Sequence, residues 1–546
     1  MFALDCAFEI EKGCGAENQQ EGDSQMMKIA SGILAMALVM PALAQAQSVD
    51  VSIDTSAPGA EINRNIYGQF VEQALGRGVY DGIWVGEKSK IPNIRGYRKD
   101  VVDALKAIHV PLVRWPGGCF GDVYDWRDGI GPRAKRPITL NRVIYTEDNT
   151  VGTHEYFDFI DLLGADAYVS VNVGSGSPME AAHWVEYMTS DKDTSLTRLR
   201  AKNGHPKPWT LKFVGIGNEL WGCGGSMNAQ YVSDVSKRYA QFINAPAAMG
   251  MTKIFAGPNG AGTNGTNANV LNYTETMMKN MPNMQMLSIH MYTVPHARSP
   301  GTPQGAPFTR GPATGFDEQE YALTLSKGLA MEPLLTQLSE VMDKTDPTKR
   351  TALSIDEWGT WYDHEIGESY DFQQNTIRDA EVAALTLNSF QRHTDRVKMS
   401  NIAQMVNLLQ SMILTKGDKM IVTPTYHIYD MYQPFMGATP YPAHVSAAEY
   451  RYGDYHIPQI DVSAAKGKDG KLYLAIVNTD PHKSVDVRTG LTGSATGRIL
   501  TGPAMDTHNT FDAPNTIRPV AFSGISENGK LVFKMPPLAI AVVAVQ

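Results

Sequence analysis

Short apolar runs alternate with longer amphipathic stretches through most of the chain. The short runs predict buried strands, and the stretches between them repeat apolar positions at helical spacing. Because strand and helix alternate, we expect parallel strands joined by helical crossovers. Eight strand-like runs predict a (β/α)8 barrel of the α/β class, whose chemistry gathers at the carboxyl ends of the strands. The expected strands are 66–71, 110–114, 167–173, 211–216, 253–257, 286–290, 351–355 and 401–406, and the helix-like segments include 99–108, 154–163 behind a Thr153 cap, 229–248, 321–343 and 376–393.

After a helix-like segment at 425–434, the pattern changes to short strands separated by turns. Such a pattern predicts a β-sandwich, which we expect to be jelly-roll-like. Residues 48–53 alternate apolar and polar positions before the barrel begins and would add an N-terminal strand to the sandwich. We therefore expect that strand within 47–60, a barrel over 61–437 and the sandwich over 438–546. The predicted sandwich strands are 459–463, 472–478, 484–487, 498–500, 517–522, 531–534 and 538–545, with a hairpin turn at 468–471.

Residues 26–46 have the pattern of an export signal. Lys28 precedes an apolar run at 29–40, and small residues alternate at 42–46 as at a cleavage site. An uncleaved anchor is the alternative, but the run is shorter than the roughly 20 residues that span a bilayer. We expect a periplasmic or secreted protein with no membrane partner after cleavage. Residues 1–25 would be an upstream extension without a structural role.

The composition narrows the classes of partner and cofactor. A chain of 546 residues with 43% hydrophobic residues can bury a large core, and a net charge of -9 without a long basic block argues against nucleic acid. Removal of the signal would leave two cysteines, Cys119 and Cys223. The strict geometry of disulfides favours free thiols over one bridge. No Cys-x-x-Cys or His-Glu-x-x-His spacing occurs, so we expect no metal site and no cofactor.

Two of the predicted strands each deliver a glutamate at the carboxyl end. Glu219 follows the run 211–216, and Glu357 follows the run 351–355. Cleavage of a glycosidic bond needs one carboxylic acid to protonate the departing oxygen and one carboxylate beside the carbocation-like centre. The pair therefore predicts a sugar hydrolase with Glu219 as acid/base and Glu357 as nucleophile.

Neighbouring residues fit the same chemistry. The amide of Asn218 is placed to hydrogen-bond a sugar hydroxyl, and flat faces for a sugar ring are expected from Trp221, Trp358 and Trp361. Each feature also has a structural interpretation, because a glutamate after a strand can cap a helix and tryptophans at strand ends often belong to the core. The pairing of two glutamates favours catalysis.

Six motifs, in their order along the chain, carry a family resemblance. They are Asn65–Glu72, Arg114–Cys119, Gly217–Gly222, Ser288–Tyr292, Asp356–Trp358 and Asn401–Asn407. Together they resemble family 51 of the glycoside hydrolases, whose members are mostly α-L-arabinofuranosidases. The resemblance covers nearly all of the chain after the predicted signal and implies the same barrel with a C-terminal sandwich.

The resemblance also implies roles for single residues. Arg114 matches an arginine beside the nucleophile, where a guanidinium favours an ionised carboxylate. Trp361 matches a tryptophan that packs at the sugar pocket. His290 stays open, since it either orients a catalytic carboxyl or fills a hydrogen-bond network. Without the resemblance, the tendency of buried polar groups to satisfy one another would favour structural roles for Arg114, Cys119, Tyr292 and Gln404. The positions that match the subsite for the terminal arabinose are Glu72, Cys119, Asn218, Tyr292 and Gln404.

The activity implied by the resemblance is that of a retaining, exo-acting α-L-arabinofuranosidase. It would release terminal arabinofuranose from arabinan, arabinoxylan or arabino-oligosaccharides by double displacement, with its two carboxyls about 5 Å apart. The resemblance further implies a homo-oligomer, either a trimer or a hexamer. The alternatives are β-xylosidase or endoglucanase activity on the same barrel, a metal-dependent hydrolase, and a noncatalytic carbohydrate-binding protein.

Overall fold

The computed structural model describes residues 47–73, 76–140, 146–260, 267–296, 310–365, 368 and 371–546. The predicted extension 1–25 and the predicted signal 26–46 lie outside these residues. Within the described ranges, no helix combines the length and the apolar character needed to cross a membrane.

Eight parallel strands close into a barrel, which confirms the predicted fold class. Each strand pairs in parallel with the next, and the last pairs with the first through Asn401 and Gly68. Residues such as Val113 and Ile289 are fully buried because both faces of a parallel barrel are covered. The strands are β2 (Gly68–Phe70), β5 (Leu112–Trp115), β8 (Asp166–Val171), β9 (Phe213–Ile216), β10 (Thr252–Phe255), β11 (Met286–Thr293), β12 (Ala352–Thr360) and β13 (Val397–Ile402).

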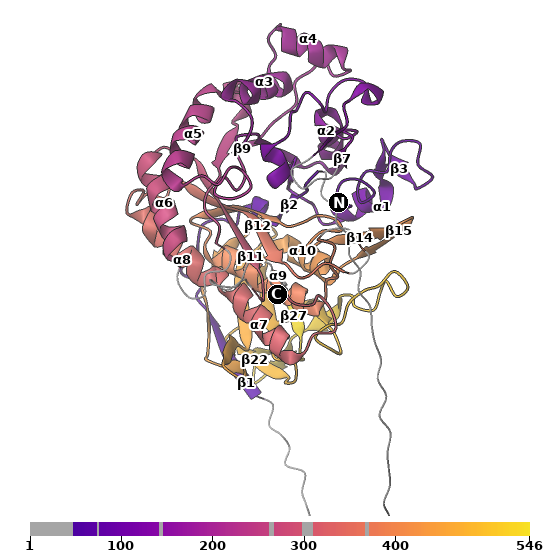
Figure 1. Ribbon diagram of the computed structural model, residues 1–546. Coiled ribbons are helices and arrows are strands. Elements are labelled where there is room, and N and C mark those ends of the chain that lie inside the picture. The colour runs from indigo at the N-terminus through magenta and orange to yellow at the C-terminus, as the bar shows by residue number, and fades with distance from the viewer. Residues whose placement is uncertain are drawn as a thin grey trace, which may run out of the picture. The chain divides into compact units, whose positions relative to one another are not determined.

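Helices cover the outside of the barrel, and α5, α6 and α8 follow one another along one side of it (Figure 1). The predicted helix 321–343 is two helices, because Ala330 ends one and begins the next. The predicted helix 229–248 ends at Phe242, shortly before Pro246, whose ring disfavours a helical residue ahead of it. The helices are α1 (Lys99–Ala107), α2 (Thr153–Leu163), α3 (Pro178–Thr189), α4 (Ser195–Lys202), α5 (Ala229–Phe242), α6 (Ala268–Asn280), α7 (Glu318–Leu329), α8 (Met331–Asp343), α9 (Ile377–Arg392) and α10 (Pro424–Tyr432).

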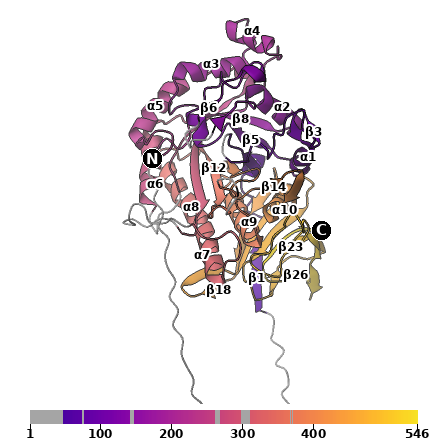
Figure 2. The ribbon, with the colours of Figure 1, turned by 45° about the vertical axis from the view of Figure 1, so that its right-hand side comes forward.

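Two sheets near the C-terminus form the predicted sandwich. Strand β1 (Gln47–Ile53) pairs in parallel with β22 and antiparallel with β17, so the N-terminal strand does join it (Figure 2). Val49 and Phe533 of this first sheet share a core with Ile476 and Ala541 of the second. The first sheet also contains β17 (Ala443–Val445), β22 (Val485–Thr489), β25 (Ile525–Glu527) and β26 (Lys530–Met535), and the second contains β16 (Thr439–Tyr441), β20 (Ile460–Lys466), β21 (Leu472–Asn478), β23 (Ala495–Thr501), β24 (Val520–Ser523) and β27 (Ala539–Val545).

Helix α9 is buried almost along its whole length, because it packs on barrel strand β12 and on sandwich strands β20, β21 and β27. Polar contacts join the same elements. Asn388 and Arg392 both bind the carboxylate of Asp461 on β20, at 2.6 Å and 3.1 Å. The helix therefore belongs to the interior of both parts.

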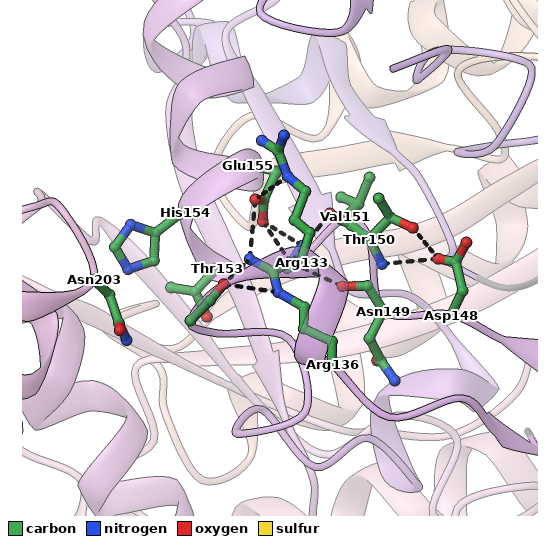
Figure 3. Close-up of polar contacts among 12 residues, drawn as sticks. Arg133, Arg136, Asp148, Asn149, Thr150, Val151, Thr153, His154, Glu155 and Asn203 are labelled. Atoms are coloured by element: carbon green, nitrogen blue, oxygen red, sulfur yellow. Dashed lines mark hydrogen bonds and ion pairs between the residues drawn. The ribbon is translucent and has the colours of Figure 1, made fainter. Parts of the chain in front are cut away.

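The long connection from β5 to α2 is held by a buried charge cluster (Figure 3). Glu155, in the first turn of α2, accepts hydrogen bonds from Arg133 at 2.8 Å and from Arg136 at 3.0 Å. It also accepts the backbone N–H of Gly152 at 2.9 Å, so Gly152, rather than the predicted Thr153, is the N-cap. Arg136 in turn binds the carbonyl of Asn149 at 2.8 Å. These bonds fix a connection whose first residues enter the candidate site.

Candidate active site

Glu219 lies in a tight turn directly after β9. Gly217 has φ 78° and Glu219 itself has φ 41°, a left-handed conformation that costs a residue with a Cβ some strain. The turn is held from below by Asp122, whose carboxylate accepts the backbone N–H groups of Asn218 at 2.8 Å and of Val173 and Gly174. The chain thus holds the Glu219 carboxyl above the end of the barrel.

Glu357 reaches the same place through an irregularity in β12. Ile289 pairs with Ile355 while His290 pairs with Glu357, so Asp356 is one extra residue in β12. Such a bulge changes the direction of the side chains that follow it. Asp356 itself points into the barrel, where Tyr168 donates to it at 2.6 Å and Asn401 at 3.1 Å.

The surroundings of Glu357 favour its ionised form. Arg114 donates to Oε1 at 2.8 Å, and the hydroxyl of Tyr292 donates to Oε2 at 2.7 Å. Burial alone would raise the pKa of Glu357, but the charges of His290 and Arg114 together with these two hydrogen bonds lower it below the ordinary value. A carboxylate held in this way is suited to act as a nucleophile.

His290 lies between the two glutamates. Its Nδ1 is 2.9 Å from Oε1 of Glu219 and 3.5 Å from Oε2 of Glu357, and one carboxylate oxygen of each glutamate lies within 4.8 Å of the other. Burial opposes the charged imidazole, but the two carboxylates outweigh burial and raise the pKa of His290. The structure therefore brings together the two predicted catalytic carboxyls and the histidine whose role the sequence left open.

Glu72 closes one side of the site. Its carboxylate accepts the backbone N–H of Phe120 at 2.9 Å, and its own backbone N–H donates to Gln404 at 3.0 Å. A Cβ on Gly118 would lie 3.1 Å from the Glu72 carboxylate and 3.2 Å from that of Glu357, so this glycine lets the two acids approach each other. Burial raises the pKa of Glu72 to about 8, so the carboxyl holds a proton at neutral pH.

Asn218 and Trp361 also lie at the site. The amide oxygen of Asn218 accepts a hydrogen bond from Arg114, which in turn binds Glu357. Trp361 packs against Tyr292 with ring centroids 5.1 Å apart, and its indole N–H donates to Asp371 at 3.1 Å. The expectation for Trp358 is wrong, because its ring is 1% exposed and packs edge-on against Phe390 in the core.

Cys119 and Cys223 form a disulfide, contrary to the sequence-based expectation of free thiols. The loops after β5 and β9 converge at the rim of the barrel and place the two Cα atoms 5.6 Å apart, within the range that a disulfide requires. Sγ of Cys223 lies 3.5 Å from Oε2 of Glu219, and Sγ of Cys119 lies 4.0 Å from the same oxygen. The sulfur pair therefore forms a wall of the site beside Glu219.

The sequence assigned no supporting role to Asp122 or Asp356. Asp122 follows the Arg114–Cys119 motif by only three residues, and Asp356 is the first residue of the Asp356–Trp358 motif. Position beside or within a motif is the one signal that could have identified their roles. Both are at most 2% exposed and bind groups that lie in or directly after β8, far from them in the sequence, which no local pattern reveals.

Comparison with known proteins decides the family. Residues 104–304 match the model of an α-L-arabinofuranosidase 1 domain, and residues 356–539 match that of an α-L-arabinofuranosidase C-terminal domain. The chain is 41% identical over 515 residues to the intracellular exo-α-L-arabinofuranosidase of Bacteroides ovatus, covering 92% of this chain and 97% of that protein. The chain belongs to the α-L-arabinofuranosidases of glycoside hydrolase family 51.

Solved structures agree with this family. The family 51 arabinofuranosidase of Xanthomonas axonopodis pv. citri is 44% identical and superposes with a TM-score of 0.86, covering 91% of this chain and 100% of that one. An arabinose complex of the Thermotoga maritima α-L-arabinofuranosidase is 28% identical, with a TM-score of 0.77 and coverage of 91% and 100%.

The predicted localisation of this family 51 member is wrong. The Bacteroides ovatus relative is named as an intracellular enzyme, which contradicts the expectation of a periplasmic or secreted protein with a signal peptide.

Proposed function

We propose that the protein is an exo-acting α-L-arabinofuranosidase that cleaves with retention of configuration. The observation that carries the proposal is the separation of the catalytic pair, with a carboxylate oxygen of Glu219 within 4.8 Å of one of Glu357. Retaining glycosidases hold their two carboxyls about 5 Å apart, whereas inverting enzymes leave a wider gap for water.

The reaction proceeds in two displacements. Glu357, ionised because its pKa is lowered, attacks the anomeric carbon while Glu219 gives its proton to the departing oxygen. The carbon–oxygen bond to the leaving group breaks as the ester bond to Glu357 forms. Glu219, now a carboxylate, then takes a proton from water, which attacks the anomeric carbon and releases arabinose and free Glu357.

The remaining predicted residues hold the sugar and the nucleophile. Arg114 and Tyr292 orient the two oxygens of Glu357. Glu72 carries a proton at neutral pH and serves as a hydrogen-bond donor to a sugar hydroxyl as well as an acceptor. His290 contacts both catalytic carboxyls and orients Glu219. Asn218 and Gln404 supply further amide groups, and Trp361 an apolar face.

Two variants test the roles of the glutamates. Glu357→Gln should abolish turnover of every substrate, because the covalent step is lost. Glu219→Ala should spare aryl arabinofuranosides with good leaving groups far more than natural linkages, because only the latter need protonation. Equal losses on both kinds of substrate would refute the acid role of Glu219.

The sugar and the mode of attack need a separate measurement. Release of nitrophenol from α-L-arabinofuranoside and β-D-xyloside substrates separates the proposed activity from a β-xylosidase. Product analysis on branched arabinoxylan and linear arabino-oligosaccharides then identifies the substrate among arabinan, arabinoxylan and oligosaccharides. Release of single arabinose units supports exo action, and internal fragments of the main chain would indicate an endoglucanase-like enzyme.

The resemblance also supports a homo-oligomer, a trimer or a hexamer, as the working form. Ile138 and Leu140, on the connection between β5 and α2, are 73% and 71% exposed, and contact with another chain would cover them. Light scattering on the purified protein measures the mass, and a monomer would contradict this assignment.

A further inference from the structure

Among the residues that the structure describes, the Cys119–Cys223 pair is a reactive group that lies beside the proposed catalytic carboxyls and that the proposed mechanism does not use. Both cysteines are partly exposed, so a small reductant reaches them from the site. Reduction by a dithiol breaks the sulfur–sulfur bond, gives two cysteine thiols and leaves the reductant as a disulfide. The Glu219 side chain stays 18% exposed beside them.

The three side chains offer the donor set of a thiophilic cation. The two sulfurs and one carboxylate oxygen of Glu219 lie within 4.8 Å of one another. Zinc bonds of about 2.3 Å to sulfur and about 2.0 Å to oxygen, arranged as a tetrahedron, place sulfur and oxygen roughly 3.5 Å apart. The Sγ to Oε2 distances of 3.5 Å and 4.0 Å are close to that edge. A bonded pair of sulfurs cannot chelate a metal, so only the reduced pair qualifies.

We propose that reduction of the Cys119–Cys223 disulfide creates a site for Zn²⁺, or another thiophilic divalent cation, whose ligands are the two thiolates and Glu219. Binding releases the two thiol protons and leaves a fourth position for water. Nδ1 of His290 lies 2.9 Å from the other oxygen of Glu219. It orients this carboxylate in the way that hydrogen-bond partners of the metal ligands do in zinc sites. The cation binds the oxygen of Glu219 that would otherwise carry the proton for the leaving group. Binding therefore inhibits the enzyme.

The binding half of this proposal depends only on the geometry, whereas the inhibition half rests on the proposed acid role of Glu219. The two halves therefore need separate readouts. Cys6 and Cys14 lie outside the described residues and would add thiols of their own. All measurements are best made on full-length protein carrying Cys6→Ser and Cys14→Ser, so that every thiol counted belongs to the pair.

The test compares the oxidised and the phosphine-reduced forms of this protein, each titrated with Zn²⁺ alone. We expect the reduced form to bind one zinc ion per chain and to lose its activity on arabino-oligosaccharides, whose linkages need the proton of Glu219, in step with binding. Chelation of the zinc should restore this activity. We expect the oxidised form to do neither. Replacing zinc by Co²⁺ should give a thiolate charge-transfer band only in the reduced form.

Cys223→Ser in the same background should lose tight zinc binding and the charge-transfer band. The comparison of oxidised and reduced protein does not depend on Cys223→Ser. A folding defect in that variant would therefore leave the test intact. Absence of zinc binding by the reduced form, or equal binding by both forms, would overturn the site. Stoichiometric binding without loss of activity would keep the site and refute the acid role of Glu219.

Discussion

The hydroxyl of Tyr292 is one of two hydrogen-bond donors that favour the ionised form of Glu357. Tyr292→Phe removes that donor, so the pKa of Glu357 should rise. Since catalysis needs the carboxylate, the acid limb of the pH profile of kcat/KM should move upward by about one pH unit, the equivalent of one hydrogen bond to a charged group. Activity is then lost first at low pH. Tyr429→Phe is a matched control, because that buried hydroxyl has no hydrogen-bond partner within the described residues; an unchanged acid limb in Tyr292→Phe would contradict the role of the hydroxyl.

Asp122 also supports the site through a single side chain, because its carboxylate holds the turn that carries Glu219. Its two oxygens accept three backbone N–H groups, and an asparagine would turn an N–H toward at least one of those donors. Asp122→Asn should therefore displace Glu219 and lower kcat by about 100-fold, the usual effect of a misplacement near 1 Å. Asp125→Asn, at an exposed position three residues away, should leave kcat unchanged. Steady-state kinetics on an arabino-oligosaccharide, whose leaving group needs the proton of Glu219, measure both variants. A normal kcat in Asp122→Asn would show that the turn holds without the Asp122 carboxylate.

Single residues also show where sequence reasoning ends. Glu219 and Glu357 were predicted to lie close together because each follows a strand-like run, and the barrel brings the ends of those strands together. The Cys119–Cys223 bond was missed because pairing depends on the distance between two loops, which strand order alone does not define. The bulge at Asp356 was missed for a similar reason, since it is visible only against the neighbouring strand.

At the scale of elements, helices α7 and α9 bury a carboxyl that the proposed mechanism does not use. Glu381 on α9 is 0% exposed, and the hydroxyl of Tyr321 on α7 lies 2.7 Å from it and 2.8 Å from the carbonyl of Thr479. One hydroxyl has one proton. The carbonyl can only accept, so Tyr321 donates to Thr479 and accepts from a protonated Glu381. Burial accordingly raises the pKa of Glu381 from 4.5 to about 8.

This raised pKa predicts how stability depends on pH. The unfolded chain releases the Glu381 proton near pH 4.5, but the folded protein keeps it to about pH 8. Its contribution to stability is therefore fully present below pH 4.5 and is lost as pH rises through about 8. Relative to Glu381→Gln, the wild-type protein should lose stability steadily across this window, as measured by denaturant unfolding at several pH values. Glu340→Gln, on the outer face of α8, is a control that should follow the wild type; parallel curves for Glu381→Gln and wild type would mean that Glu381 is ionised in the fold.

Element boundaries were harder to predict than element order. The last barrel strand was expected at 401–406 but spans Val397–Ile402, because the apolar run continues past the strand into the site loop that carries Gln404. Helix α9 was predicted within one residue at each end, since Thr376 caps it with Asp379 and Arg392 ends it. Local caps are visible in a sequence, whereas the end of a barrel strand is determined by its neighbours.

At the scale of the whole molecule, the barrel and the sandwich share an interior rather than a loose boundary. Helix α9 is buried by both, and the bonds of Asn388 and Arg392 to Asp461 cross from one to the other. The chain also enters the sandwich first, through β1, before it builds the barrel. Damage to the sandwich should consequently reach the catalytic part through α9.

Val49→Asp tests this coupling, because it places a charge in the sandwich core far along the chain from Glu219 and Glu357, the proposed catalytic pair. Val49 is 0% exposed and pairs with Val487 of β22, and its side chain lies in the core between the two sheets. An unpaired buried charge at this position costs about 3–5 kcal/mol. Ser52→Asp introduces the same charge on the exposed face of the same strand and should cost almost nothing. If α9 couples the two parts, Val49→Asp should lower the midpoint temperature of a single unfolding transition that both parts share. Circular dichroism during heating and residual activity after heating measure this midpoint. Two separate transitions, with activity lost only in the later one, would show that the barrel folds and works without the sandwich.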